Sequence, residues 1–160
     1  MEASEYPKPP KPRFKHCDYL RNFIVPERLE ERVKLAARAL KYHEFDAIAF
    51  RGMSGALISV PLALKMCKTM IMVRKPGDDS HSTFLVEGDT QARKYVIVDD
   101  FVATGDTVRT IKREVVKFAP DSECIGVLPV NEIDIEEFEK NKYGRNNLYP
   151  LWNNWKSKYD

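Results

Sequence analysis

Residues 96–108 constrain the fold of this chain more than any other segment. They read VIVDDFVATGDTV: an apolar strand, two acidic residues, a turn of small residues and the first residues of a helix. A buried strand that passes through a short turn into a helix is a building block of α/β proteins. We therefore expect a strand at 95–98 and an amphipathic helix at 107–118.

The same alternation of strand and helix extends over residues 45–128. Apolar runs at 45–50, 70–73 and 123–128 predict three more strands, and residues 56–67 predict a helix between two of them. Continuous apolar strands separated by helices predict a parallel twisted sheet that is flanked by helices on both faces. Pro61 lies inside the 56–67 helix, which therefore needs a kink or a late start. Residues 74–94 predict a long loop with a small hairpin.

Length and composition indicate one domain at 16–160, preceded by an extended arm rich in proline and lysine at 1–15. Pro26 and the acidic residues that follow it predict the start of a further helix. A net charge of +2 is too small to indicate nucleic acid as a partner. The longest apolar stretch, residues 56–64, is too short to span a bilayer, so we expect no membrane partner.

The three cysteines predict a reducing compartment. Cys17, Cys67 and Cys124 are far apart and form no C-x-x-C pair, which argues against a disulfide framework and against a zinc site. Cys67 and Cys124 stand among apolar residues and are interpreted as small core side chains. No signal peptide is recognised, and we expect a cytoplasmic protein.

Three segments whose residues could bind a ligand or take part in a reaction fall at the ends of predicted strands. They are residues 51–55, 74–77 and 99–107. In a parallel sheet the carboxyl ends of the strands share one edge, which is where such folds bind ligands. We therefore expect these three segments to build one site.

Asp99 and Asp100 follow a strand directly. Adjacent carboxylates repel each other and need partners, such as sugar hydroxyls or a hydrated divalent cation. The alternative interpretation is a pair of capping or loop acids.

Residues 103–107, ATGDT, combine features of an anion-binding turn. Small residues allow close approach of the backbone, Gly105 can adopt a positive φ, and the free N–H groups of the following helix bind phosphate. Thr104 and Thr107 add hydroxyl donors, whereas the charge of Asp106 should point away from a phosphate. The alternative is an ordinary capped helix start.

Residues 96–107 resemble the phosphoribosyl-pyrophosphate (PRPP) binding motif of type I phosphoribosyltransferases: three apolar residues, two acids, three apolar or small residues and a T-G-x-T core. Arg51-Gly52 is similar to the family's pyrophosphate loop, whose peptide bond is often cis. The segment 73–77, VRKPG, resembles the start of the mobile loop of adenine-type members. The resemblance covers about residues 45–128.

The resemblance implies transfer of 5-phosphoribose from PRPP to a nucleobase, with Mg²⁺ as the cofactor and closure of loop 75–94 over the substrate. It implies catalytic roles for Arg51, Arg74 and Glu87, and metal binding by Asp99 and Asp100. It implies that PRPP is bound by Arg51, Gly52, Lys75, Asp99, Asp100, Ala103, Thr104, Gly105, Asp106 and Thr107. Glu87 has the alternative interpretation of a charged loop tip.

The acceptor base is less well defined. Ala103 stands where the hypoxanthine-guanine and xanthine branch usually has Asp, so the resemblance favours a purine of the adenine type. A hood from the termini, with a C-terminal segment at about 129–160, would cover the base. There Tyr149, Trp152 and Trp155 either stack on the base or pack a terminal helix onto the sheet. We also expect a homodimer. The alternative function is a non-catalytic regulatory protein of the same fold that binds PRPP.

Overall fold

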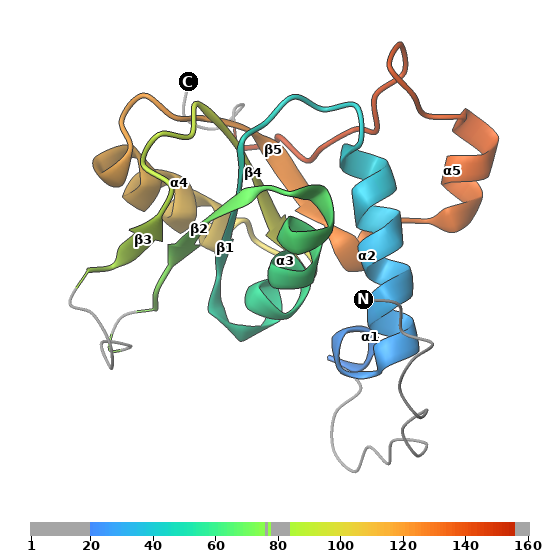
Figure 1. Cartoon of the computed structure of the whole chain (residues 1–160), viewed down its shortest axis with the longest axis horizontal. Coiled ribbons are helices and arrows are strands. Elements are labelled where there is room, and N and C mark those ends of the chain that lie inside the picture. Colours follow the sequence, from blue (N-terminus) through green and yellow to red (C-terminus); the bar gives the residue numbers. More distant parts are fainter. Residues whose placement is uncertain (1–19, 76, 78–83, 156–160) are drawn as a thin grey trace.

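The structure is a computed structural model that describes residues 20–75, 77 and 84–155, so the arm at 1–15 and Cys17 lie outside the described residues. Its centre is a five-stranded sheet with the order β3-β2-β1-β4-β5 (Figure 1). The strands are β1 (Ala47–Arg51), β2 (Thr69–Val73), β3 (Val86–Gly88), β4 (Lys94–Asp99) and β5 (Glu123–Pro129). Strand β1 pairs in parallel with β2 and β4, β4 pairs in parallel with β5, and β3 runs antiparallel to β2. The predicted α/β fold with a mostly parallel sheet is confirmed.

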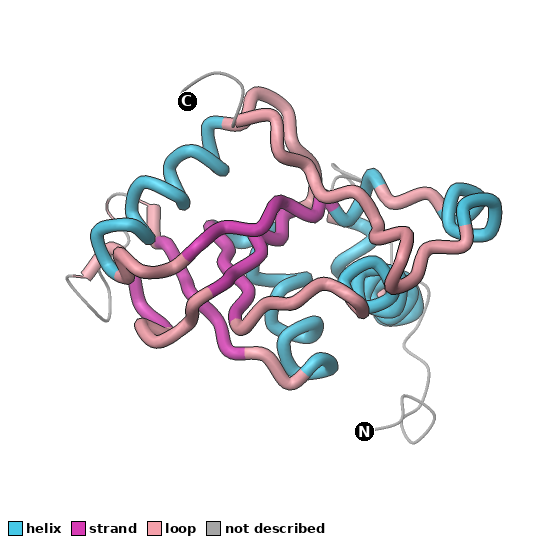
Figure 2. The backbone as a smooth tube through the Cα atoms, turned by 90° about the horizontal axis from the view of Figure 1, so that it is seen from above, coloured by secondary structure: helices cyan, strands magenta, loops and turns pink. Residues whose placement is uncertain are grey.

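Helices cover both faces of this sheet, as Figure 2 shows. Helix α4 lies on one face, and α2 and α3 lie on the other, so the molecule has two apolar cores. The helical elements are α1 (Arg21–Ile24), α2 (Pro26–Leu40), α3 (Gly52–Met66), α4 (Asp106–Phe118), the 3₁₀ turn η2 (Val130–Glu132) and α5 (Ile135–Asn141). No helix in the described ranges is long and apolar enough to cross a membrane.

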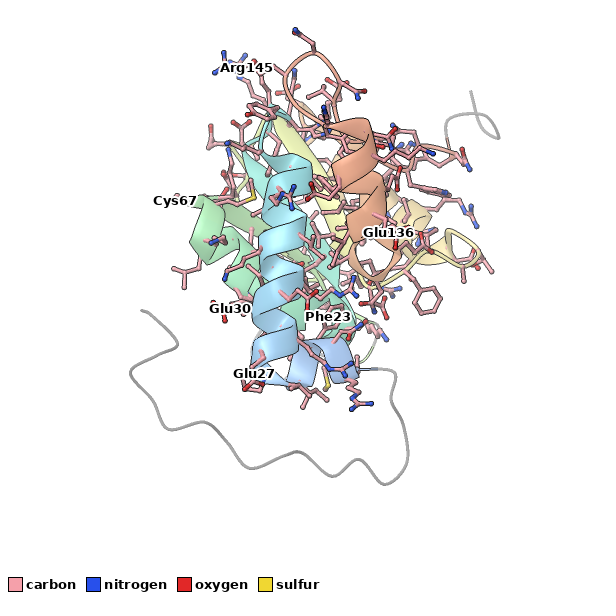
Figure 3. All side chains as sticks on the ribbon, turned by 90° about the vertical axis from the view of Figure 1, so that its right-hand side faces the viewer. Phe23, Glu27, Glu30, Cys67, Glu136 and Arg145 are labelled. Atoms are coloured by element: carbon pink, nitrogen blue, oxygen red, sulfur yellow. The ribbon has the colours of Figure 1, made fainter. Side chains whose placement is uncertain are left out.

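Helices α2 and α4 follow from their sequence pattern. Pro26 is the first residue of α2, where its missing N–H costs nothing, and Val33, Ala36 and Leu40 are buried along one face. Figure 3 shows Glu27 and Glu30 of α2, both exposed. In α4 the buried side chains are Val108, Ile111 and Val115, as the helical period predicts.

Helix α3 begins earlier than the sequence predicts. We expected a turn at 51–55 and a helix from residue 56, but β1 ends at Arg51 and α3 begins at Gly52. Gly52 makes this abrupt change of direction with a φ of +74°. The Arg51-Gly52 peptide bond is trans, unlike the cis bond that the family resemblance implies. Pro61 lies in the helix interior, where it removes the hydrogen bond to the carbonyl of Leu57.

The segment after β2 forms the predicted hairpin. The N–H of Arg74 donates to the carbonyl of Leu85 at 2.8 Å, and β3 follows directly. Residues 76 and 78–83 of the expected mobile loop lie outside the described part of the chain.

The chain after β5 returns to the sheet. Phe138 of α5 stacks on Tyr149, with ring centroids 5.0 Å apart, and both are buried in the core that contains α2. The tail then pairs with β5 through Trp152 and Val127. Cys124 is buried as expected, but the interpretation of Cys67 as a core residue was wrong. Cys67 follows the last turn of α3 and is exposed (Figure 3).

Candidate active site

A cavity of about 200 Å³ lies at the carboxyl ends of the parallel strands. It is lined by Arg51, Ser54, Lys75 and every residue from Asp99 to Val108. The three segments that were expected to meet at one edge of the sheet therefore do so. Of the predicted PRPP-binding residues, all but Gly52 line this cavity, and Gly52 lies beside it under Lys75.

Asp99 and Asp100 form the buried floor of the cavity. The N–H of Asp100 donates to Oδ1 of Asp99 at 2.9 Å, and its carbonyl accepts from the N–H of Asn131 at 2.8 Å. Burial, reinforced by the neighbouring Asp100 carboxyl, raises the pKa of Asp99 to about 7, while Lys75 opposes the shift. The backbone contacts therefore hold the pair in place, and burial makes ionisation of Asp99 unfavourable.

The acid pair fits hydroxyl donors or a divalent cation. Asp100 is 3% exposed, and its Oδ2 is buried without a hydrogen-bond partner in the described structure. A buried carboxylate oxygen without a partner is unfavourable, and both a sugar hydroxyl and Mg²⁺ would satisfy it. No three His, Cys, Asp or Glu side chains converge anywhere in the described ranges. A cation at Asp99 and Asp100 would therefore need further oxygen ligands from substrate or water.

Residues 103–107, here called the phosphate loop, lead from β4 into α4. Gly105 has a φ of +84° and immediately precedes the first helical residue. The first turn of a helix presents N–H groups without partners inside the helix, and here that turn lines the cavity. The loop thus has the backbone geometry of an anion site.

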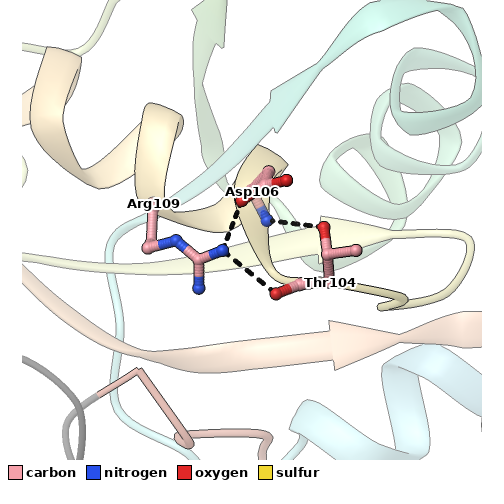
Figure 4. Close-up of polar contacts among 3 residues, drawn as sticks. All are labelled: Thr104, Asp106 and Arg109. Atoms are coloured by element: carbon pink, nitrogen blue, oxygen red, sulfur yellow. Dashed lines mark hydrogen bonds and ion pairs between the residues drawn. The ribbon is translucent and has the colours of Figure 1, made fainter.

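The carboxylate of Asp106 is neutralised within the loop, which explains how an acid is tolerated there. Its Oδ1 pairs with Nη2 of Arg109, and the same nitrogen donates to the carbonyl of Thr104 at 3.1 Å (Figure 4). The N–H of Asp106 donates to Oγ1 of Thr104 at 3.3 Å. Arg109 therefore ties both ends of the turn together, a role that sequence reasoning missed.

The cavity also has two basic lining residues, Arg51 and Lys75. Arg51 ends β1, and its Nε is buried without a hydrogen-bond partner among the described residues. A Cβ built on Gly52 would lie 3.0 Å from Cε and 3.4 Å from Nζ of Lys75, so the lysine lies directly over this glycine. Ser54, in the first turn of α3, also lines the cavity and was missed because that segment was expected to be a turn.

Arg74 and Glu87, both predicted to be catalytic, contact each other and do not line the cavity. Nη2 of Arg74 lies 2.7 Å from Oε2 of Glu87, and the arginine side chain is only 10% exposed. Successive residues of an extended chain point to opposite sides, so Lys75 faces the cavity while Arg74 faces β3.

The tail aromatics lie outside the cavity. Tyr149 and Trp155 are buried in the two cores, and Trp152 lies against Gly105 on the outer side of the phosphate loop. Asn131 of η2, after β5, contacts the acid pair through the carbonyl of Asp100, and its Oδ1 accepts from Nδ2 of Asn22 of α1 at 3.1 Å.

Known proteins provide a context for this site. No protein-family model matches the chain. It is 33% identical over 107 residues to the adenine phosphoribosyltransferase of Fervidobacterium nodosum, an alignment that covers 58% of this chain and 63% of that protein. The chain therefore spans less than two thirds of the length of this relative.

Solved structures share the fold. The adenine phosphoribosyltransferase of Thermoanaerobacter pseudethanolicus superposes with a TM-score of 0.55 at 23% identity, covering 76% of this chain and 78% of that one. The orotate phosphoribosyltransferase of Aeropyrum pernix gives a TM-score of 0.56 at 16% identity, covering 70% and 63%. These neighbours act on different bases, so the likeness extends over the fold and leaves the base open.

Proposed function

We propose that this chain is a member of the type I phosphoribosyltransferase family and that it transfers 5-phosphoribose from PRPP to a nucleobase with release of pyrophosphate. The observation that carries the proposal is the cavity itself. One space is lined by a buried acid pair, a helix N-terminus with a glycine turn, and two basic side chains from other strand ends. These are the groups that ribose hydroxyls, a phosphate and a pyrophosphate each require.

Each part of the cavity has a chemical task in the proposed reaction. The phosphate loop binds the 5′-phosphate through backbone N–H groups and the hydroxyls of Thr104 and Thr107. Asp99 and Asp100 accept hydrogen bonds from the ribose hydroxyls. Holding the sugar at both places orients its C1 for attack by a base nitrogen.

Departure of pyrophosphate from C1 builds negative charge on the leaving group. Arg51 and Lys75 line the same cavity as the phosphate loop and stabilise that charge. Mg²⁺, held by Asp99 and Asp100, would add further positive charge there when bound. We propose a purine of the adenine type as the acceptor, because Ala103 stands where the resemblance gives the hypoxanthine-guanine and xanthine branch an Asp.

A regulatory protein that binds PRPP without turnover is the second candidate. The observation that favours it is the pairing of Arg74 with Glu87 outside the cavity, which leaves Arg51 and Lys75 as the basic residues that line it. Such a protein needs the acid pair and the phosphate loop but has less need of stabilisation for a leaving group.

An assay of pyrophosphate release separates these functions. The protein is incubated with PRPP, Mg²⁺ and each of a panel of purine and pyrimidine bases, with Asp100→Asn as the matched control. We expect release with a purine, and a loss of at least about tenfold in Asp100→Asn because a charged hydrogen bond to ribose is removed. PRPP binding without release for any base would favour the regulator. Unchanged turnover in Asp100→Asn would contradict the role of the acid pair.

We also propose that the protein is a homodimer that pairs through α3. This helix carries no charged residue before Lys65, and its outward face presents the exposed side chains of Met53, Val60 and Leu64. A helix that is apolar on all sides is normally buried. An uncharged apolar stripe is complementary to itself in a two-fold arrangement, so a second copy of the chain is the partner that fits it.

A further inference from the structure

We infer that Trp152 is a positioning residue for the phosphate loop, and that the C-terminal tail thereby sets the affinity for the 5′-phosphate of PRPP. The inference rests on the proposed function, because it assumes that this loop binds that phosphate. It concerns a residue far from the motif in sequence and outside the cavity.

Trp152 and Arg109 hold Gly105 from the same side. A Cβ built on Gly105 would lie 3.1 Å from Cη2 of Trp152 and 3.0 Å from Nη1 of Arg109. The indole edge and the guanidinium therefore both press against the same face of the glycine Cα. Because interiors are packed without gaps, the loop cannot move outward at Gly105 unless one of these side chains moves.

The indole is itself held firmly. The N–H of Trp152 donates to the carbonyl of Val127 at 2.9 Å, and the N–H of Val127 donates to the carbonyl of Trp152 at 3.0 Å. Just before it, Leu151 packs so closely on β5 that a Cβ on Gly126 would lie 2.5 Å from Cβ of Leu151. The backbone on both sides of the indole is therefore fixed to the sheet.

The tail is also fixed to α4. The ring of Trp155 lies 5.4 Å from that of Trp152, it is buried, and Nζ of Lys112 lies 4.4 Å above it. Trp152 and Val102 both pack against the core that contains α4, and Val102 lines the cavity. The tail thus connects β5, α4 and the phosphate loop.

This arrangement predicts an effect on binding rather than on chemistry. Without the indole, the phosphate loop loses its packing partner at Gly105. The loop then samples conformations that do not fit a phosphate. The phosphate is bound equally in the ground state and in the transition state, because it takes no part in bond breaking at C1. Loss of Trp152 should therefore raise KM for PRPP and leave kcat nearly unchanged.

The two tryptophans of the chain, Trp152 and Trp155, allow a direct optical test. Trp155→Phe leaves Trp152 as the single fluorophore, and Trp152→Phe leaves Trp155. We expect PRPP, and inorganic phosphate at higher concentration, to change the emission of the Trp155→Phe protein in a saturable way. The Trp152→Phe protein should show a much smaller change.

Equilibrium binding of PRPP to the full chain completes the test. We expect Trp152→Ala to raise the Kd for PRPP by about tenfold, Trp152→Phe to recover most of the affinity, and Trp155→Phe to bind within about twofold of wild type. Wild-type affinity in Trp152→Ala, or a silent Trp152 emission on saturation with PRPP, would overturn the inference. If wild type itself does not bind PRPP, the proposed function fails and the inference fails with it.

Discussion

Arg74 and Glu87 form an ion pair across the β2–β3 hairpin, with 2.7 Å between Nη2 and Oε2. The arginine side chain is almost buried, so this partner, and not water, compensates its charge. We expect Glu87→Gln to lower the free energy of unfolding by about 1–3 kcal/mol, because a charged hydrogen bond is replaced by a weaker one. Urea unfolding measures this change.

The same variant tests the role of Glu87 in catalysis. With the pair outside the cavity, kcat of Glu87→Gln should remain within about twofold of wild type when assayed well below its unfolding midpoint. A large loss of kcat with unchanged stability would instead support the catalytic role of Glu87 that the family resemblance implies.

Asp99 should make stability depend on pH. Its pKa is raised by burial from 3.8 in the unfolded chain to about 7 in the folded protein, so the folded state binds the proton more tightly. The stabilisation is complete below about pH 4 and is lost as pH rises towards about 7, by at most about 1.4 kcal/mol per pH unit. Asp99→Asn should show a flatter profile in urea unfolding across this window. If the stability of wild type and of Asp99→Asn changes with pH in the same way, the raised pKa of Asp99 is contradicted.

Ligand affinity should change with pH in the opposite direction. Ribose hydroxyls and Mg²⁺ both require the ionised carboxylate, so PRPP affinity should rise with pH up to about 7 and then level off. A tenfold gain per pH unit is the upper limit for one proton. Calorimetric titration at several pH values, in buffers of different ionisation enthalpy, would also detect the released proton. No proton release on binding would exclude Asp99 as its source.

Arg51→Ala should reduce turnover more than PRPP affinity. Arg51 faces the cavity with a buried Nε that has no partner in the described structure, and its charge is most useful when negative charge develops on pyrophosphate. We expect kcat to fall by about 10²-fold with a much smaller change in Kd. Arg51→Lys keeps the charge but not the forked donors, so its kcat should lie between those of wild type and Arg51→Ala. A loss of PRPP affinity with unchanged kcat would instead mean that Arg51 binds the ground state and the transition state equally.

Leu64→Glu should separate the proposed dimer. Leu64 is 80% exposed on α3, so the isolated chain should tolerate the charge, whereas two copies would bring like charges together. Sedimentation velocity should show a monomer, with the unfolding free energy of the dilute protein nearly unchanged. Lys65→Glu, one residue further along the same helix, is a charge control that should leave the dimer in place. Identical sedimentation of wild type and Leu64→Glu would rule out this face as the interface.

Local patterns in the sequence predicted the sheet and most of the cavity. The apolar runs became β1, β2, β4 and β5, of which β1, β4 and β5 are largely buried. The acids and small residues after β4 lie at the cavity because parallel strands end at one edge. The start of α3 was missed because a glycine with positive φ opens it, and no periodic pattern marks such a start. Ser54 was overlooked for the same reason.

Contacts between distant segments were beyond the reach of sequence patterns. Whether Arg74 or Lys75 faces the cavity depends on the pairing of β2 with β3, which adjacent residues do not encode. The contact of Trp152 with Gly105 depends on how the tail pairs with β5. Both are products of tertiary packing.

The contact of Trp152 with Gly105 also has a consequence for the order in which the protein matures during synthesis. Synthesis completes the five strands at Pro129, before Trp152 has been added to the chain. The indole that supports the phosphate loop leaves the ribosome only later. The support of the phosphate loop is therefore made last, and a chain interrupted between these two points would lack it together with the core side chain of Trp155.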